Sequence, residues 1–181
     1  MLRAFFGIPL DKATIKRLLQ DISMLSLALG DNVRWSKPDL WHITVKFLAN
    51  VHPSDLASLA EAADLFAQVT QTFPLQITKI ACFPRPKARI IAAYIAPNPN
   101  LHALLGQLDQ IGEKMGIKME TRRYRPHITL GKFKSETQYV EPILYPNFQT
   151  NINKIVLYQS KPSAEGSHYL PLQQFALCET N

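Results

Sequence analysis

The first thirty residues combine a short apolar run with a longer segment of helical periodicity. Residues 2–8 form the apolar run, which predicts a buried strand, and Asp11 follows where it can cap a helix. Gly30 stands where it can end that helix. The apolar positions that recur at helical spacing between these two residues are Ile15, Leu18, Leu19, Ile22 and Leu25.

Two extended segments and a second helix are predicted next. Residues 33–36 and 40–48 have the pattern of extended chain, and in the longer segment we expect one face to lie in the core. The members of that face are Trp41, Ile43, Val45 and Phe47. The tripeptide at 52–54, His-Pro-Ser, predicts a turn and a helix cap. The apolar face of the helix that follows consists of Leu56, Leu59, Ala63 and Phe66.

The middle of the chain predicts a hairpin and a third helix. Residues 75–83 and 89–96 are typical of strands, and the short segment 84–87, with two prolines, joins them. Asn98 followed by Pro99 predicts a cap and a first helical turn, and Gly116 the end of the helix. The residues expected on its inner face are Leu101, Leu104, Leu105, Leu108, Ile111 and Met115.

The last third predicts strands at 127–133, 152–158 and 168–177, with a helix around 136–144. This order of strands and helices is typical of an α+β fold. Because no Gly/Ser-rich linker or low-complexity tract divides the chain, we expect one domain over residues 1–181 in which two lobes share an interface.

The composition favours an anionic partner. The chain has a net charge of +6 and a pI near 9.4, which makes nucleic acid the leading candidate. Its two cysteines, Cys82 and Cys178, lack the spacing of a zinc ribbon or a redox motif, so we expect buried free thiols. No apolar run has the length of a signal peptide or of a membrane span. We therefore expect a soluble, cytoplasmic and monomeric protein without contact to a membrane.

A His-x-Thr motif followed by an aliphatic residue occurs twice, once in each half of the chain. The copies are His42-Ile43-Thr44-Val45 and His127-Ile128-Thr129-Leu130. Side chains alternate between the faces of a strand, so each histidine shares a face with its threonine while the aliphatic residues anchor the other face. One copy alone is ordinary strand composition, but two copies predict one site with two acid–base groups.

Two imidazoles and two hydroxyls without neighbouring carboxylates or cysteines suit metal-free cleavage of a phosphoester. One histidine would take a proton from the nucleophile while the other gives one to the leaving oxygen, and an imidazole with a pKa of ~6.5 can do either. Thr44 and Thr129 would donate hydrogen bonds to the non-bridging phosphate oxygens, each worth about 1.5–3 kcal/mol. We expect neither a metal nor a cofactor.

Basic residues crowd the second motif, with one tyrosine among them. They are Arg122, Arg123, Arg125, Lys132 and Lys134, and the tyrosine is Tyr124. Among these residues we expect Arg125, Tyr124 and Arg123 to bind substrate, because cations and aromatic rings together suit phosphates and bases. The histidines without a threonine partner are interpreted as structural or surface residues: His52, His102 and His168.

In these motifs and their flanks the chain resembles the two-histidine phosphoesterases, and among them the LigT-like RNA 2′,3′-cyclic phosphodiesterases. The segments that carry the resemblance are 3–9 (RAFFGIP), 34–35 (RW), 40–48 (LWHITVKFL), 83–86 (FPRP), 125–130 (RPHITL) and 160–169. Trp41 and Ala49 depart from the usual family pattern beside the first motif, where they bear on the shape of the cleft.

The resemblance implies an α+β fold of two pseudo-symmetric lobes, with antiparallel sheets that enclose a central cleft and helices on the outside. It also implies that His42 is the proton donor to the leaving 3′-oxygen and that His127 is the proton acceptor that activates water. The substrates would then be RNA or nucleotide 2′,3′-cyclic phosphate ends, and the product a 2′-phosphate.

Two other functions stay open on the sequence alone. The same site could carry out 2′-5′ RNA ligation or cleave a 2′-5′ phosphodiester, with the same acid–base pair acting on a different nucleophile. A non-catalytic module that binds RNA ends would keep the basic cleft, although binding alone needs no pair of titratable imidazoles.

Overall fold

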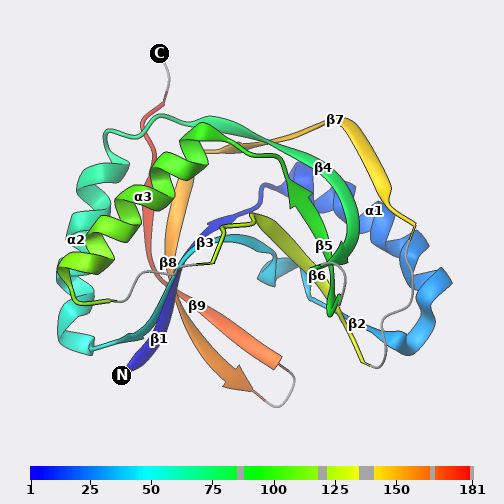
Figure 1. Ribbon diagram of the computed structural model, residues 1–181, viewed down its shortest axis with the longest axis horizontal. Coiled ribbons are helices and arrows are strands. Elements are labelled where there is room, and N and C mark those ends of the chain that lie inside the picture. Colours follow the sequence, from blue (N-terminus) through cyan, green and yellow to red (C-terminus); the bar gives the residue numbers. More distant parts are fainter. Residues whose placement is uncertain (85–87, 118–121, 135–140, 164–165, 180–181) are drawn as a thin grey trace.

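The computed structural model describes residues 1–84, 88–117, 122–134, 141–163 and 166–179, and contains nine strands and three α-helices in that part of the chain (Figure 1). The helices are α1 (Lys12–Leu29), α2 (Leu56–Ala67) and α3 (Pro99–Lys114). The strands are β1 (Leu2–Pro9), β2 (Val33–Trp35), β3 (His42–Val51), β4 (Phe73–Phe83), β5 (Ile90–Ile95), β6 (His127–Phe133), β7 (Ile143–Ile152), β8 (Lys154–Ser163) and β9 (Gly166–Ala176).

The strands pair into one sheet that has two halves. The order is β7-β4-β5-β6-β3-β1-β8-β9, with β2 paired to β6 beside this path, and the pairings between these strands are antiparallel. Between β3 and β6 the pairing consists of Ile43 opposite Ile128. The predicted α+β class is confirmed, and the two sheets expected from the resemblance are joined into one through this pair.

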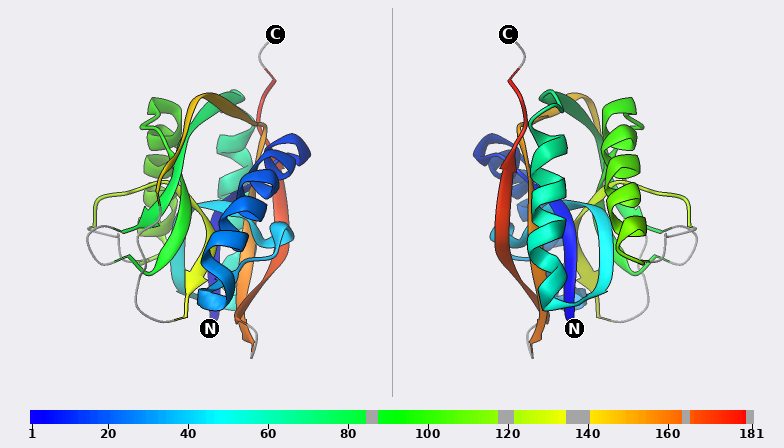
Figure 2. Two further views of the ribbon diagram at one scale, coloured as in Figure 1. Left: turned by 90° about the vertical axis from the view of Figure 1, so that its right-hand side faces the viewer. Right: turned by 90° about the vertical axis from the view of Figure 1, so that its left-hand side faces the viewer.

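The three helices cover opposite ends of the sheet. The views of Figures 1 and 2 show α2 and α3 side by side at one end and α1 at the other. Helix α3 contacts β3, and α2 contacts β8 and β9, whereas α1 follows β1 in the chain but contacts β7 in the other half. Each half of the sheet therefore has its own helical cover.

The helix ends follow the caps expected from the sequence. The carboxylate of Asp11 accepts a hydrogen bond from the backbone N–H of Thr14, and the Asn98 side chain accepts one from the N–H of Leu101 at 3.0 Å. Gly30 ends α1 with a φ of +52°, a backbone conformation that favours glycine.

Strand β3 departs from the predicted alternation. Phe47, expected in the core, is 47% exposed, whereas Lys46 is only 3% exposed and forms an ion pair with Asp109 of α3. The register between β1 and β3 shifts twice, once between Ala4 and Phe5 and once between Phe6 and Gly7. Each shift adds a residue to β3, and such a bulge restarts the alternation of faces.

The predicted helix around 136–144 is wrong where the structure describes it. Residues 135–140 lie outside the described part, but Ile143 and Leu144 begin β7, which pairs with β4. Sequence periodicity missed this strand because its buried face carries the polar Thr150, whose hydroxyl donates to the Asp11 carboxylate at 3.1 Å. The strand predicted over 152–158 accordingly divides, with Ile152 ending β7 and Lys154 beginning β8.

The two cysteines have different surroundings. Cys82 is buried, as expected, but Cys178 is exposed, so the prediction of a buried thiol is wrong there. Cys178 lies beyond β9, where its backbone is bonded to the loop around Thr70 and its side chain reaches the surface. Within the described residues, no helix combines the length and apolar character of a membrane span.

Candidate active site

The two motifs meet where the halves of the sheet join. Because Ile43 and Ile128 are partners in an antiparallel ladder, the register places His42 opposite Thr129 and Thr44 opposite His127. Both isoleucines are fully buried on one face. The histidines and threonines alternate with them, so all four belong to the opposite face and form a quartet.

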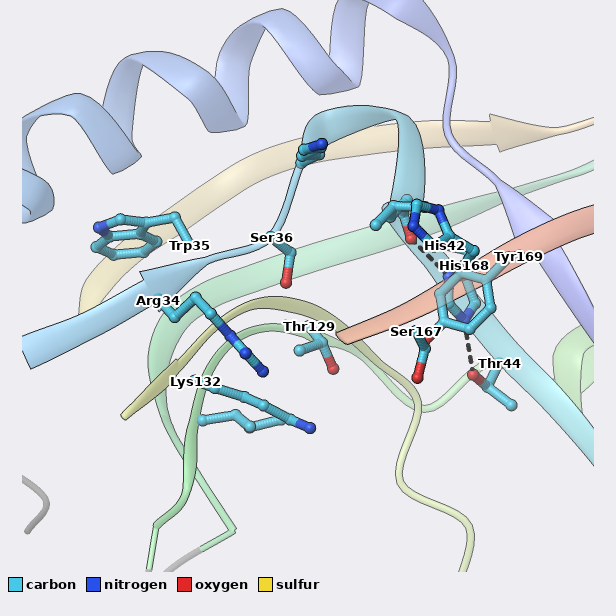
Figure 3. A pocket seen from close by; sticks show the side chains of 13 residues that line it. Arg34, Trp35, Ser36, His42, Thr44, Thr129, Lys132, Ser167, His168 and Tyr169 are labelled. Atoms are coloured by element: carbon cyan, nitrogen blue, oxygen red, sulfur yellow. Dashed lines mark hydrogen bonds between the residues drawn. The ribbon is translucent and has the colours of Figure 1, made fainter. Parts of the chain in front are cut away.

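The two histidines of the quartet are held in the same way. His42 Nδ1 lies 2.8 Å from the carbonyl oxygen of Leu40, and His127 Nδ1 lies 2.7 Å from that of Arg125. A carbonyl oxygen only accepts, so each Nδ1 carries a proton and donates it. In the neutral ring Nε2 is then the free base, and at His42 it accepts from the Thr44 hydroxyl at 3.0 Å (Figure 3).

Aromatic rings pack around both imidazoles. His42 lies 4.9 Å, between ring centroids, from Phe5 and also from the edge-on ring of Tyr169. His127 stacks on Phe83 at 4.2 Å with 25° between the planes. A Cβ atom at Gly7 would lie 3.3 Å from the His42 ring, so the absence of a side chain at this position of β1 leaves room for the imidazole.

Burial has the largest effect on the pKa of both imidazole rings. It lowers the pKa of His42 and that of His127, and the carbonyl bond of each Nδ1 offsets part of this effect. A charge on His127 lowers the pKa of His42 further. The two titrations are therefore linked, and a second proton in the quartet is disfavoured until an anion binds.

A cavity of about 570 Å³ opens over three members of the quartet and is lined by residues from both halves of the sheet. Its wall includes His42, Thr44 and Thr129, and Figure 3 shows these residues with the others that surround the hollow. The remaining lining residues are Arg34, Trp35, Ser36, Lys37, Leu40, Ile90, Lys132, Ser167, His168 and Tyr169. Three of these are cations and none is a carboxylate, so the cavity suits an anion.

Two of the cations face each other across a strand pair. Arg34 of β2 is the direct partner of Lys132 of β6, and Figure 3 shows their side chains extended side by side. Like charges directly opposite in a sheet are unfavourable without a counter-charge. A phosphate at the neighbouring Thr129 would provide that counter-charge.

The structure divides the predicted site residues between two cavities. His42, Thr44 and Thr129 line the first cavity, and His127 lies opposite Thr44 in register. Three others line a second cavity of about 620 Å³: Arg123, Tyr124 and Arg125. The Tyr124 hydroxyl donates to the Thr44 carbonyl oxygen at 2.9 Å, and burial raises the pKa of this tyrosine.

Sequence reasoning missed several residues of the first cavity. His168, interpreted as structural or surface, lines it together with Ser167 and Tyr169 of β9. The missed residues of β2 and β9 belong to segments 34–35 and 160–169, which resemble the family in sequence. Their position beside the quartet depends on the pairing of β2 and the course of β9, which the sequence did not predict. Trp41 is buried, donates from its indole N–H to the Ser36 carbonyl at 3.1 Å, and is not part of the described cavity wall.

No group of three or more metal-ligating side chains occurs in the part of the chain that the structure describes.

The chain matches known proteins in sequence and in structure. The sequence model of the family described as LigT like Phosphoesterase matches residues 8–92. A protein of Geobacillus stearothermophilus named RNA 2′,3′-cyclic phosphodiesterase is 28% identical over 86% of this chain and 51% of its own length. A protein of the same name from Bacillus subtilis is 25% identical over 71% of this chain and 69% of its own. The chain thus spans about half the length of the first relative.

Solved structures share the fold over almost the whole chain. TT0787 of Thermus thermophilus superposes with a TM-score of 0.88 at 19% identity, over 99% of this chain and all of that one. LigT of E. coli in its apo form gives 0.79 at 23% identity over 98% of both chains, and LigT complexed with 3′-AMP gives 0.78 at 24% identity over 97% and 98%. The family model matches slightly less than half of this chain, and the solved structures show that the chain has the LigT-like fold.

Proposed function

We propose that this chain hydrolyses RNA or nucleotide 2′,3′-cyclic phosphate ends to 2′-phosphates by acid–base catalysis with two histidines and without a metal. The observation that carries the proposal is the matched setting of His42 and His127, each with Nδ1 bonded to the carbonyl two residues earlier. This setting fixes both rings so that Nε2 is the nitrogen that exchanges protons. The names of the two sequence relatives agree with this chemistry.

The proposed reaction is one displacement at phosphorus. Nε2 of His127 takes a proton from water as the water oxygen bonds to phosphorus, and the bond from phosphorus to the 3′-oxygen breaks. Protonated Nε2 of His42 gives its proton to that leaving oxygen. One proton is gained and one lost by the protein, and exchange with solvent restores both rings.

The resemblance implies that His42 donates the proton and His127 accepts one, and the electrostatic surroundings of the two histidines agree with these roles. The charge of His127 and burial both lower the pKa of His42, which makes protonated His42 a readier donor. Thr44 and Thr129 are placed to donate to the non-bridging oxygens, and the nearby pair Arg34 and Lys132 balances the charge of the phosphate.

The experiment is to incubate the purified chain with 2′,3′-cyclic AMP in excess chelator and to identify the product isomer by chromatography against standards. We expect 2′-AMP. Formation of 3′-AMP would contradict the proposed leaving group. Binding without turnover would favour the non-catalytic module, and in a parallel incubation with RNA ends a 2′-5′-linked product would favour ligation.

A further inference from the structure

Tyr124 differs from the basic residues that surround it in the sequence. Arg122, Arg123 and Arg125 are exposed, whereas Tyr124 is half-buried and packs against the core. Its ring also meets the ring of His102 on α3 edge-on, with 6.1 Å between the centroids. Contacts within the protein therefore fix the place of this ring.

The hydroxyl of Tyr124 joins the two halves of the sheet. It donates to the backbone carbonyl oxygen of Thr44 on β3 at 2.9 Å, across 80 positions of the chain. Burial raises the pKa of Tyr124, so the hydroxyl keeps its proton and stays a donor throughout the pH range in which histidines titrate. The bond thus runs from the segment before the second motif to a member of the first motif.

The pairing between the strands that carry the two motifs is short. In the part of the chain that the structure describes, β3 pairs with β6 through Ile43 opposite Ile128. Thr44 is the next residue of β3, so the bond from Tyr124 lies directly beside this pair. Because a short ladder restricts its neighbours weakly, an added bond at Thr44 limits the movement of β3 relative to β6.

The segment that carries Tyr124 is anchored in the other half of the sheet. The carbonyl oxygen of Arg125 accepts from His127 Nδ1 at 2.7 Å, and that of Pro126 accepts from the backbone N–H of Ile95 on β5 at 3.3 Å. Residues 124–126 are therefore held by β5 and β6, and the Tyr124 hydroxyl fixes the Thr44 backbone relative to them.

Thr44 in turn contacts the reacting nitrogen of His42. Its hydroxyl donates to His42 Nε2 at 3.0 Å, as Figure 3 shows. A threonine side chain is stiff about χ1, so a shift of the Thr44 backbone displaces the hydroxyl with it. Displacements of this kind lower the rate of a reaction that depends on the alignment of its groups.

We propose that Tyr124 is a positioning residue, whose hydroxyl holds the Thr44 backbone so that the Thr44 hydroxyl stays aligned with His42 Nε2. Tyr124 acts through Thr44 and needs no contact with the substrate, which differs from the substrate binding expected from the sequence. This inference rests on the proposed hydrolysis and adds a residue to its machinery.

The test compares two variants that each lose one tyrosine hydroxyl. Tyr124→Phe keeps the ring and loses the bond to Thr44. Tyr145→Phe is the matched control, because the Tyr145 hydroxyl is also buried and bonded across the fold, to Asp21 of α1, and Tyr145 lines neither cavity. With 2′,3′-cyclic AMP we expect Tyr124→Phe to lower kcat by about 3- to 10-fold and to change KM by less than about twofold. Tyr145→Phe should keep the kcat of wild type even if its unfolding temperature falls.

A double variant shows whether Tyr124 acts through Thr44. Thr44→Val already lacks the hydroxyl that Tyr124 positions, so the addition of Tyr124→Phe should lower kcat by less than about twofold more. If the two residues had independent roles, the two losses would multiply in the double variant, and that result would overturn the proposal. A wild-type kcat in Tyr124→Phe would also overturn it.

A measurement without turnover separates this inference from the proposed hydrolysis. In an isotope-labelled sample at a pH above the imidazole range, His42 Nε2 is a neutral acceptor, and its nitrogen chemical shift reports the bond from Thr44. We expect this signal to move toward that of an unbonded nitrogen in Tyr124→Phe and in Thr44→Val, but not in Tyr145→Phe. Such a change would support the proposal even if cyclic AMP is not hydrolysed. An unchanged His42 signal in Tyr124→Phe would overturn the proposal even if cyclic AMP is hydrolysed.

Discussion

Ile43 and Ile128 pair directly with each other, and among the described residues theirs is the pairing that joins β3 to β6. Both side chains are fully buried. The quartet of histidines and threonines lies on the face opposite this pair, so the packing of the two isoleucines sets the separation of the two motifs. The packing of this pair and the proposed catalysis therefore depend on the same point of the sheet.

Shortening one of these side chains should weaken the contact between β3 and β6. We expect Ile128→Ala to lower the free energy of unfolding by about 2–5 kcal/mol and Ile128→Val by only about 0.5–1.5 kcal/mol, because the larger deletion leaves a larger cavity. Urea denaturation followed by circular dichroism measures both values. Equally small losses of unfolding free energy in the two variants would show that the contact between β3 and β6 does not depend on this packing.

Gly7 should prove necessary for the position of the His42 ring. A Cβ there would lie 3.1 Å from the Phe5 ring and 3.3 Å from the His42 ring, so Gly7→Ala should displace the imidazole and lower kcat several-fold. The matched control is Gly106→Ala on α3, where an added Cβ meets nothing within 4 Å. That control should keep full activity and gain about 0.5–1 kcal/mol of stability. Similar kcat values in both variants would show that Gly7 is not needed for the position of the His42 ring.

The two threonines should contribute through their hydroxyls. Thr44→Val and Thr129→Val keep the β-branched shape but lose a donor to the phosphate, so each should lower kcat/KM by about 10- to 100-fold, as expected for a hydrogen bond to a charged group. Steady-state kinetics with 2′,3′-cyclic AMP provide the measurement. Valine variants that match wild type would mean that strand propensity alone explains these threonines.

The dependence of the rate on pH should be bell-shaped. The proposed mechanism needs His127 neutral and His42 protonated, and burial lowers the pKa of both, so the optimum of kcat/KM should lie on the acid side of the usual imidazole range. Bound phosphate favours the protonated rings and should move the kcat profile to higher pH. A profile that rises without turning over between about pH 5 and 9 would indicate one titrating group.

The same shifts have a consequence for stability. Since the pKa of each buried imidazole is lower in the folded state, the unfolded chain binds more protons once the pH falls to ~6.5. The contribution of the neutral rings to stability is therefore present above that pH and is lost as the pH falls through it.

Local signals in the sequence predicted most of the elements. Asp11, Asn98 and Gly30 act on their own helix ends, so caps and boundaries were readable without knowledge of the fold. The paired motif likewise needed only the alternation of a strand, which puts each histidine on the face of its threonine.

Features that depend on the partner strand could not be predicted from the sequence. The bulges that expose Phe47 and bury Lys46 arise from the register with β1. Strand β7 is defined by its pairing with β4 and not by its own periodicity. The contributions of Arg34 and His168 to the first cavity depend on segments that meet only in the folded sheet.

The central claim is that His42 and His127 act together, and the most direct measurement is turnover of 2′,3′-cyclic AMP in chelator by the two single alanine variants and by the double variant. We expect each single variant to lose about 10²–10⁴ in kcat and the double variant to lose little more, because either missing group stops the same step. His52→Ala, at an exposed histidine bonded to Ser54, should match wild type. Near-normal turnover by either His42→Ala or His127→Ala, with the fold intact by circular dichroism, would contradict the account.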